Sequence, residues 1–165
     1  MNYEMIDVKQ QEKEKLYKLL QYALYDGSQY IDNDVNEECI FEYRWFDNYF
    51  TDEDRSAYFI KSGKTYVGMV MVNENLKFNK NGKCIAEFLI MPRFRRNHIG
   101  KRVAYETFEK FRGDWEVLWS ALSFQAQAAS SRFSSTTHLS SPPSKRERRL
   151  PIDSARICLN MSLSI

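Results

Sequence analysis

The sequence predicts one mixed α/β domain, in which helices pack on a central sheet, followed by a tail of different character. The main observation is that apolar residues recur with helical spacing in some stretches and form β-branched runs in others, in the order β, α, α, β, β, β, α, β. The second is size: 165 residues with 43% hydrophobic content are enough for one core and too few for two ordinary domains.

The first helix is expected over residues 10–26. From Leu16 onward, its apolar residues fall at i, i+3, i+4, i+7 and i+8, and Gly27 is a natural stop. Residues 26–38 are polar and acidic, which indicates a loop. A second helix is expected over about residues 36–50, because the aromatic side chains there form two rows at helical spacing.

Three strands are expected next. Residues 57–60 and 65–72 are apolar runs joined by a short glycine-containing connector, which is a hairpin signal. Gly68 lies inside the second run and indicates a bulge or a close approach of another backbone. Residues 84–91 form the third strand, and Pro92 should end it because proline cannot donate to the ladder.

The last elements of the domain are a helix and a strand. The helix is expected to begin near His98, with Asn97 as its N-cap and Gly113 at its end. Residues 115–119 are typical of the start of another strand.

Composition changes abruptly near Val117. Residues 1–117 contain 18 Lys and Arg, 20 Asp and Glu and 3 Ser, whereas the remaining 48 residues contain 6, 2 and 12. The second part also carries Pro142-Pro143 and a basic run over 145–149, a composition typical of disordered segments. We therefore divide the chain into a domain over 1–117 and an atypical Ser- and Arg-rich tail over 118–165, disordered or produced by a frameshift or fusion.

Cysteine usage and hydropathy indicate the compartment. Cys39, Cys84 and Cys158 are odd in number and far apart, which favours free thiols in a reducing compartment. With two histidines they show no metal-ligand spacing. The N-terminus lacks the pattern of a signal peptide, and no run of about 18 apolar residues occurs. These features predict a cytoplasmic protein with no metal site and no membrane span.

The sharpest functional signal is the junction over residues 85–102, where an apolar strand enters a basic, glycine-containing turn and then a helix. The first N–H groups of a helix have no intrahelical acceptor and can bind an anion. Gly100 permits close approach, and Arg95, Arg96 and Lys101 add positive charge. This pattern predicts a cradle for a phosphate or pyrophosphate.

The run Arg95-Arg96-Asn97-His98-Ile99-Gly100 resembles the acetyl-CoA motif [Gln/Arg]-x-x-Gly-x-[Gly/Ala] of the GNAT superfamily of N-acetyltransferases, in particular a group of small bacterial predicted acetyltransferases. The resemblance covers residues 3–117. It implies a mixed, mostly antiparallel sheet flanked by helices, with acetyl-CoA in a gap between the strand that carries Glu87 and the strand that begins near Trp115.

Two departures from the family pattern stand out. His98 occupies a position where the family usually has glycine. After Val117 the family continues with an Asn-x-x-Ala-x-x-[Phe/Tyr] helix and two strands, which this sequence lacks, so the C-terminal strands are expected to be missing or altered. The family's usual general acid is a tyrosine on that helix, and no acid is assigned.

The resemblance also implies roles for individual residues. Main-chain groups of Leu89, Ile90 and Met91 would pair with pantetheine, and Glu87 would act as the base that deprotonates the amine. The acidic loop would meet a cationic substrate through Asp32, Asp34, Glu37 and Glu38. The diphosphate of CoA would be held by Arg95, Arg96, Asn97, His98, Ile99, Gly100 and Lys101.

The implied activity is transfer of an acetyl group from acetyl-CoA to a primary amine of a small molecule or peptide, by direct attack in a ternary complex. One alternative is a non-catalytic CoA-binding or regulatory module. Another is a nucleic-acid-binding domain that uses residues 92–102 and 145–149, although the net acidic body argues against it. The sequence leaves a homodimer open.

Overall fold

A computed structural model describes residues 2–77, 79–118 and 158–161, and in these residues the chain forms a six-stranded sheet. The strands follow one another in sequence order, and every neighbouring pair is antiparallel except β4 and β5, which are parallel. The strands are β1 (Glu4–Asp7), β2 (Arg55–Ser62), β3 (Thr65–Asn73), β4 (Lys83–Ile90), β5 (Trp115–Leu118) and β6 (Cys158–Met161). The predicted mixed, mostly antiparallel sheet is confirmed.

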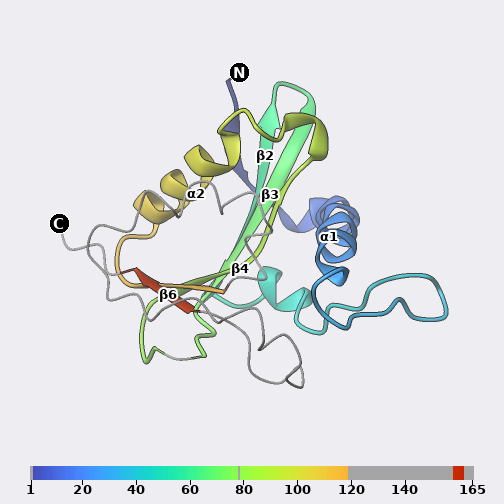
Figure 1. The fold of residues 1–165 in the computed structure, drawn as a ribbon, viewed down its shortest axis with the longest axis horizontal. Coiled ribbons are helices and arrows are strands. Elements are labelled where there is room, and N and C mark those ends of the chain that lie inside the picture. Colours follow the sequence, from blue (N-terminus) through green and yellow to red (C-terminus); the bar gives the residue numbers. More distant parts are fainter. Residues whose placement is uncertain (1, 78, 119–157, 162–165) are drawn as a thin grey trace, which may run out of the picture.

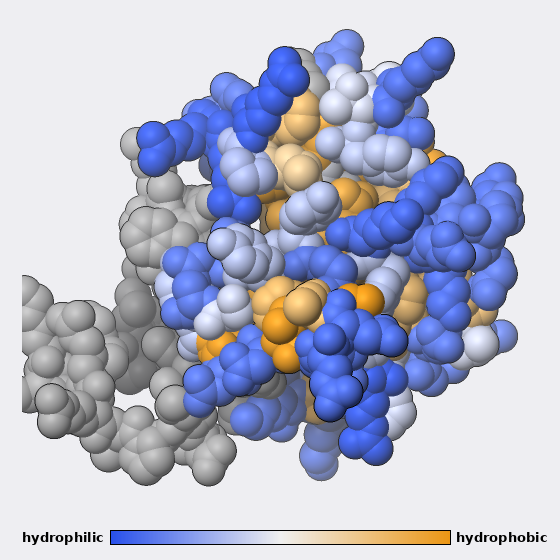
Figure 2. Space-filling view, turned by 90° about the vertical axis from the view of Figure 1, so that its right-hand side faces the viewer, coloured by the Kyte–Doolittle hydropathy of each residue, from blue (hydrophilic) through white to orange (hydrophobic). Residues whose placement is uncertain are grey.

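Helices cover both faces of this sheet (Figure 1). Helix α1 (Lys13–Ser28), entered through the 3-10 turn η1 (Gln10–Glu12), packs its buried leucines on one face. Helix α2 (Ile99–Lys110) packs Ile99, Val103 and Phe108 on the other. Figure 2 shows the α1 side, where apolar surface lies between hydrophilic side chains. The sheet therefore separates two cores, and a residue's face on β4 decides which of them it joins.

The first helix is confirmed, but Gly27 lies inside it instead of stopping it. The second helix, expected over residues 36–50, is wrong: only the 3-10 turn η2 (Asp47–Phe50) forms there. Local side chains take the backbone groups that such a helix needs. Asn36 Oδ1 accepts from the N–H groups two and four residues later, and the side chain of Gln21 on α1 both accepts from and donates to the backbone of Phe41.

The two expectations for Gly68 are both confirmed. The β2–β3 register shifts between Ile60 and Lys61, which marks a bulge beside Gly68. A Cβ placed on Gly68 would lie 1.9 Å from the carbonyl oxygen of Leu89 on β4. Only glycine allows β3 and β4 to approach this closely.

Strand β6 (Cys158–Met161) pairs antiparallel with β5 and comes from the tail, which the sequence predicts to be disordered. The rest of the tail, and with it the suggested frameshift or fusion, lies outside the described residues. In the part of the chain that the structure describes, no helix has the length and apolar character needed to cross a membrane. Within the same residues no group of three or more His, Cys, Asp or Glu side chains could hold a metal ion.

Candidate functional site

Strands β4 and β5 pair at their first residues. Their parallel pairing runs from Lys83 and Trp115 to Ile85 and Val117. Among the described residues β5 ends at Leu118, so from Ala86 to Ile90 the edge of β4 that faces away from β3 has no described strand beside it, and we call the region beside this unpaired edge the opening. The opening lies between the two strands that the family resemblance places on either side of the cofactor.

A β-bulge sets the direction of the Glu87 side chain. Met71 pairs with Glu87, and Val72 pairs with Ile85, so Ala86 is the extra residue of the bulge. Residues opposite each other share a face of the sheet, and Met71 belongs to the core under α1. Glu87 therefore projects to the α1 side, where strict alternation from Ile85 would have placed it on the α2 side.

Main-chain groups on β4 alternate between β3 and the opening. The N–H of Met91 donates to the carbonyl of Val67 (2.8 Å), so the ladder bonds fall on Met91 and Leu89, and the intervening residues face away from β3. Ile90 and Phe88 thus direct their main-chain groups to the open side. Of Leu89, Ile90 and Met91, which the resemblance assigns to pantetheine binding, Ile90 directs its main-chain groups to the open side, whereas Leu89 and Met91 face β3. Phe88 shares the orientation of Ile90, which the sequence could not indicate because the register is not visible in it.

The turn after β4 contains two residues with left-handed backbones, Arg96 (φ 63°) and His98 (φ 58°). His98 is the N-cap residue of α2, which corrects the expected N-cap Asn97, and no side-chain cap hydrogen bond forms there. The helix N-terminus is thus left without a side chain that occupies its free N–H groups. The side chains of Arg96, Asn97 and His98 are all exposed.

The beginning of α2 lies against the unpaired part of β4. A Cβ on Gly100 would be 3.6 Å from Ile90 and 3.7 Å from Phe88, which are ordinary van der Waals distances. The side chain of Ile99 is buried in the core, so only its main chain is available to a ligand. Lys101 is exposed and lies near the ring of Tyr105.

Arg95 contacts protein groups in the turn. Its Nε donates to the carbonyl of Ile90 (2.8 Å), and its Nη2 forms an ion pair with Asp26 on α1 (2.9 Å). The side chain therefore ties the end of β4 to the end of α1. The exposed positive charges at the head of α2 come from Arg96 and Lys101.

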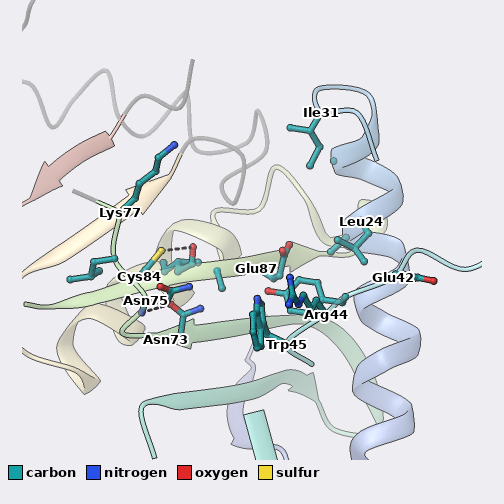
Figure 3. Close-up of a pocket in the computed structure, with 16 residues that line it drawn as sticks. Leu24, Ile31, Glu42, Arg44, Trp45, Asn73, Asn75, Lys77, Cys84 and Glu87 are labelled. Atoms are coloured by element: carbon teal, nitrogen blue, oxygen red, sulfur yellow. Dashed lines mark hydrogen bonds between the residues drawn. The ribbon is translucent and has the colours of Figure 1, made fainter. Parts of the chain in front are cut away.

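A pocket of about 610 Å³ lies on the α1 side of β4 (Figure 3). The end of α1, the loop before η2, the end of β3 with the loop that follows, and β4 contribute its walls. The lining residues are Ala23, Leu24, Gly27, Ile31, Glu42, Tyr43, Arg44, Trp45, Asn73, Asn75, Leu76, Lys77, Cys84, Ile85, Ala86 and Glu87. Glu87 thus enters the pocket from β4, and the edge of β4 that faces away from β3 borders the opening.

Two tyrosines belong to this region: Tyr43 is partly buried and lines the pocket, and Tyr49 is buried beside the lining residue Asn73. Tyr49 Oη accepts a hydrogen bond from Asn73 Nδ2 (3.1 Å), and burial raises the pKa of Tyr49 to about 12. Burial likewise raises the pKa of Tyr43 far above its ordinary value, with smaller contributions from the neighbouring Tyr49 and from the charge of Glu87. Both phenols are therefore protonated at neutral pH, and neither can serve as a base.

The acidic loop over residues 26–38 reaches this pocket through Gly27 and Ile31 and not through its carboxylates. Asp32, Asp34, Glu37 and Glu38 are exposed, and none of them lines it. The expected contact of these four carboxylates with a cationic substrate stays a prediction. The carboxylates that line the pocket come from Glu42 and Glu87.

A comparison with known protein families identifies the family of the chain. The model of the acetyltransferase (GNAT) family matches residues 15–131. The chain belongs to the GNAT acetyltransferase family. The match extends past residue 117, where the composition changes. No curated protein matches the chain.

Solved structures show the same GNAT fold at low sequence identity. The PaiA N-acetyltransferase from Thermoplasma acidophilum, in complex with coenzyme A, is 13% identical, with a TM-score of 0.53 over 81% of this chain and 87% of that chain. An acetyltransferase from Thermus thermophilus is 12% identical, with a TM-score of 0.52 over 72% and 76%. AAC(6')-Iy, in complex with a bisubstrate analogue, is 8% identical, with a TM-score of 0.55 over 88% and 99%.

The left-handed backbone of His98 gives a physical reason for the glycine that GNAT proteins usually have at this position. We expect His98→Gly to raise the free energy of unfolding by about 0.5–1 kcal/mol, since relief of the left-handed backbone exceeds the entropy gained by the unfolded chain. Urea unfolding measures the change.

Arg96→Gly is the comparison for binding. It relieves a similar left-handed backbone strain but removes a guanidinium, so acetyl-CoA affinity should fall in Arg96→Gly and stay unchanged in His98→Gly. Weaker acetyl-CoA binding by His98→Gly would contradict the view that position 98 matters through its backbone and not through its side chain.

Proposed function

We propose that the chain transfers the acetyl group of acetyl-CoA to a primary amine of a small molecule or peptide, by direct attack in a ternary complex. The observation that supports this most strongly is the arrangement of β4: one edge is unpaired beyond Ile85 among the described residues, the head of α2 abuts it, and Glu87 enters a pocket on the α1 side. Cofactor and amine would thus approach one strand from different sides.

The cofactor part of the proposal rests on the open edge and the turn. The main-chain groups of Phe88 and the N–H of Ile90 suit the polar pantetheine arm, while the carbonyl of Ile90 already accepts from Arg95. The N–H groups at the head of α2 suit the diphosphate. Arg96 and Lys101 add exposed positive charge, while Arg95 holds the turn in place. Gly100 fits this assignment, because the protein packing around it leaves room for a Cβ and so does not itself require glycine.

The chemical part assigns one proton transfer to this chain. An alkylamine is protonated at neutral pH, with a pKa of about 10.4, so a base must remove a proton before the nitrogen attacks. Glu87 is the proposed base, directly or through one water. The new N–C bond replaces the C–S bond of the thioester, the second proton lost by the nitrogen passes to the departing sulfur, and CoA leaves as its thiol. N–H donors on the open edge of β4 can stabilise the negative charge that develops on the carbonyl oxygen.

Two measurements test the function together. Titration calorimetry should detect acetyl-CoA binding, and a thiol-release assay with a panel of primary amines should detect turnover. Binding heat without thiol release would favour a non-catalytic CoA-binding module. Absence of acetyl-CoA binding would contradict both the acetyltransferase and the non-catalytic CoA-binding module.

We also propose a cytoplasmic location, to which Cys39 and Cys84 are suited because their thiols form no disulfide among the described residues.

Glu87→Gln should lower kcat by about 100-fold, because loss of a general base typically costs this much or more. Acetyl-CoA affinity should hardly change, since the amide keeps the size of the side chain and the cofactor edge is formed by main-chain groups. Glu109→Gln is the matched control, because Glu109 is exposed on α2 and lies outside the pocket. Full turnover of Glu87→Gln at neutral pH would show that another group accepts the proton.

A further inference from the structure

The charged side chains that line the pocket suggest the chemical class of the acceptor, given the proposed acetyltransferase function. They are Glu42, Arg44, Lys77 and Glu87. The side chain of Glu42 points away from the pocket in Figure 3, and its Oε1 accepts a hydrogen bond from Asn36 (3.3 Å). The pocket therefore presents two cationic residues with one carboxylate, which is already assigned to the amine.

This balance argues against a polycationic acceptor. A polyamine is bound most favourably where several carboxylates surround it, and like charges placed together cost free energy. The acidic side chains that would supply such a surface lie on residues 32–38, outside the pocket. An acceptor whose amine meets Glu87 must instead tolerate, or use, the guanidinium of Arg44.

Arg44 is held in a form suited to an anion. Its guanidinium carbon lies 4.8 Å from the ring centroid of Trp45, and both side chains are exposed. A guanidinium that stacks on an aromatic ring keeps its N–H edge free for bidentate binding of a carboxylate. Among the described residues, no carboxylate lies within ion-pair distance of Arg44.

Apolar side chains form part of the remaining walls, beside Tyr43, Asn73 and Asn75. Leu24 from the end of α1, Ile31 from the loop after it, and Leu76 from the loop after β3 line the pocket, and Trp45 is 48% exposed. These side chains can cover an apolar side group of a ligand. The pocket therefore combines the carboxylate of Glu87, the cationic residues Arg44 and Lys77, and an apolar wall.

We propose that the acceptor is a small amine that also carries a carboxylate, of the amino-acid type. Glu87 receives the proton from the amine, Arg44 binds the carboxylate, and Trp45 with the apolar wall contacts the side group. The inference rests on the proposed function and makes Arg44 the residue that determines specificity.

Two matched substrate series test the inference on the full chain: phenylalanine, phenylalaninamide and phenethylamine; and lysine, lysinamide and cadaverine. Thiol release should show kcat/KM at least about tenfold higher for each amino acid than for its amide or decarboxylated amine, because the latter leave the guanidinium unpaired. Arg44→Ala should remove this preference by raising KM for the amino acids. Arg44→Lys should retain part of the preference for amino acids. In both variants kcat/KM for phenethylamine, which has no carboxylate, should stay within about twofold of the wild-type value.

Arg112→Ala is the matched control, since Arg112 is exposed and lies outside the pocket. Unchanged acetyl-CoA affinity in Arg44→Ala shows that the variant is folded. An enzyme that acetylates cadaverine or phenethylamine as well as the amino acids overturns the inference and leaves the acetyltransferase function intact. A preference that survives in Arg44→Ala also overturns it. A chain that binds acetyl-CoA and acetylates neither series overturns both proposals.

Discussion

Replacement of Glu116 by alanine is expected to lower the free energy of unfolding by about 3 kcal/mol, since two hydrogen bonds to a charged acceptor are lost. Glu116 lies on β5 and is fully buried. Its Oε1 accepts from the N–H of Lys77 (2.8 Å) and its Oε2 from the N–H of Asn79 (3.1 Å), 39 and 37 residues away in sequence. The carboxylate thus closes the loop between β3 and β4 onto β5.

The expected loss is smaller than the sum of two full charged hydrogen bonds. Lys77 is exposed, so its N–H can turn to water once the carboxylate is gone, whereas a trapped donor would cost more. Glu116→Gln keeps one carbonyl acceptor and the same volume, and should lose about 1–2 kcal/mol. Because Leu76 and Lys77 belong to the same loop and line the pocket, both variants should also raise KM for the amine.

Urea unfolding followed by circular dichroism measures these losses. Glu109→Ala is the control, because Glu109 is exposed on α2 and its removal should change stability by no more than about 0.5 kcal/mol. A Glu116→Ala midpoint equal to that of Glu109→Ala would show that the loop does not depend on the carboxylate.

The sequence correctly predicted the elements in which apolar side chains follow a helical period or form a continuous run. The leucines of α1 and the apolar runs of β2, β3 and β4 report burial directly, so their positions were found to within a few residues. The segment over 36–50 also has aromatic side chains at helical spacing, and Phe41, Phe46 and Tyr49 are buried as a helix would require. Its backbone is nevertheless taken by Asn36 and Gln21, which periodicity cannot reveal.

The geometry of the candidate site depends on features that the sequence pattern does not show. A bulge at Ala86 decides that Glu87 faces α1, and the register with β3 decides that Phe88, not Leu89, faces the opening. The ion pair of Arg95 with Asp26 joins residues 69 positions apart, so its structural role could not be read from the motif. Local sequence identified the basic turn before α2, and tertiary contacts determined which of its members face outward.

Gly68→Ala should have the largest effect on β4, with an expected loss of about 3 kcal/mol from overpacking. The new Cβ would lie 1.9 Å from the carbonyl oxygen and 3.0 Å from the carbonyl carbon of Leu89, and 3.1 Å from Cδ1 of Ile90. Two of these atoms are backbone, so no side-chain rotation relieves the clash and the strands must separate. Separation would displace the edge of β4 that is proposed to bind pantetheine, and acetyl-CoA affinity should fall with stability.

Gly27→Ala provides the matched comparison for this substitution. Gly27 lies within α1, and a Cβ there meets no atom within 4 Å, so the variant should gain about 0.5–1 kcal/mol from helix propensity. Urea unfolding of both variants, with acetyl-CoA calorimetry of Gly68→Ala, separates the effect of added volume from the effect of losing glycine itself. If Gly68→Ala unfolds at the wild-type midpoint and binds acetyl-CoA normally, then β3 and β4 do not approach as closely as described, and the bulged hairpin is not what positions the cofactor edge.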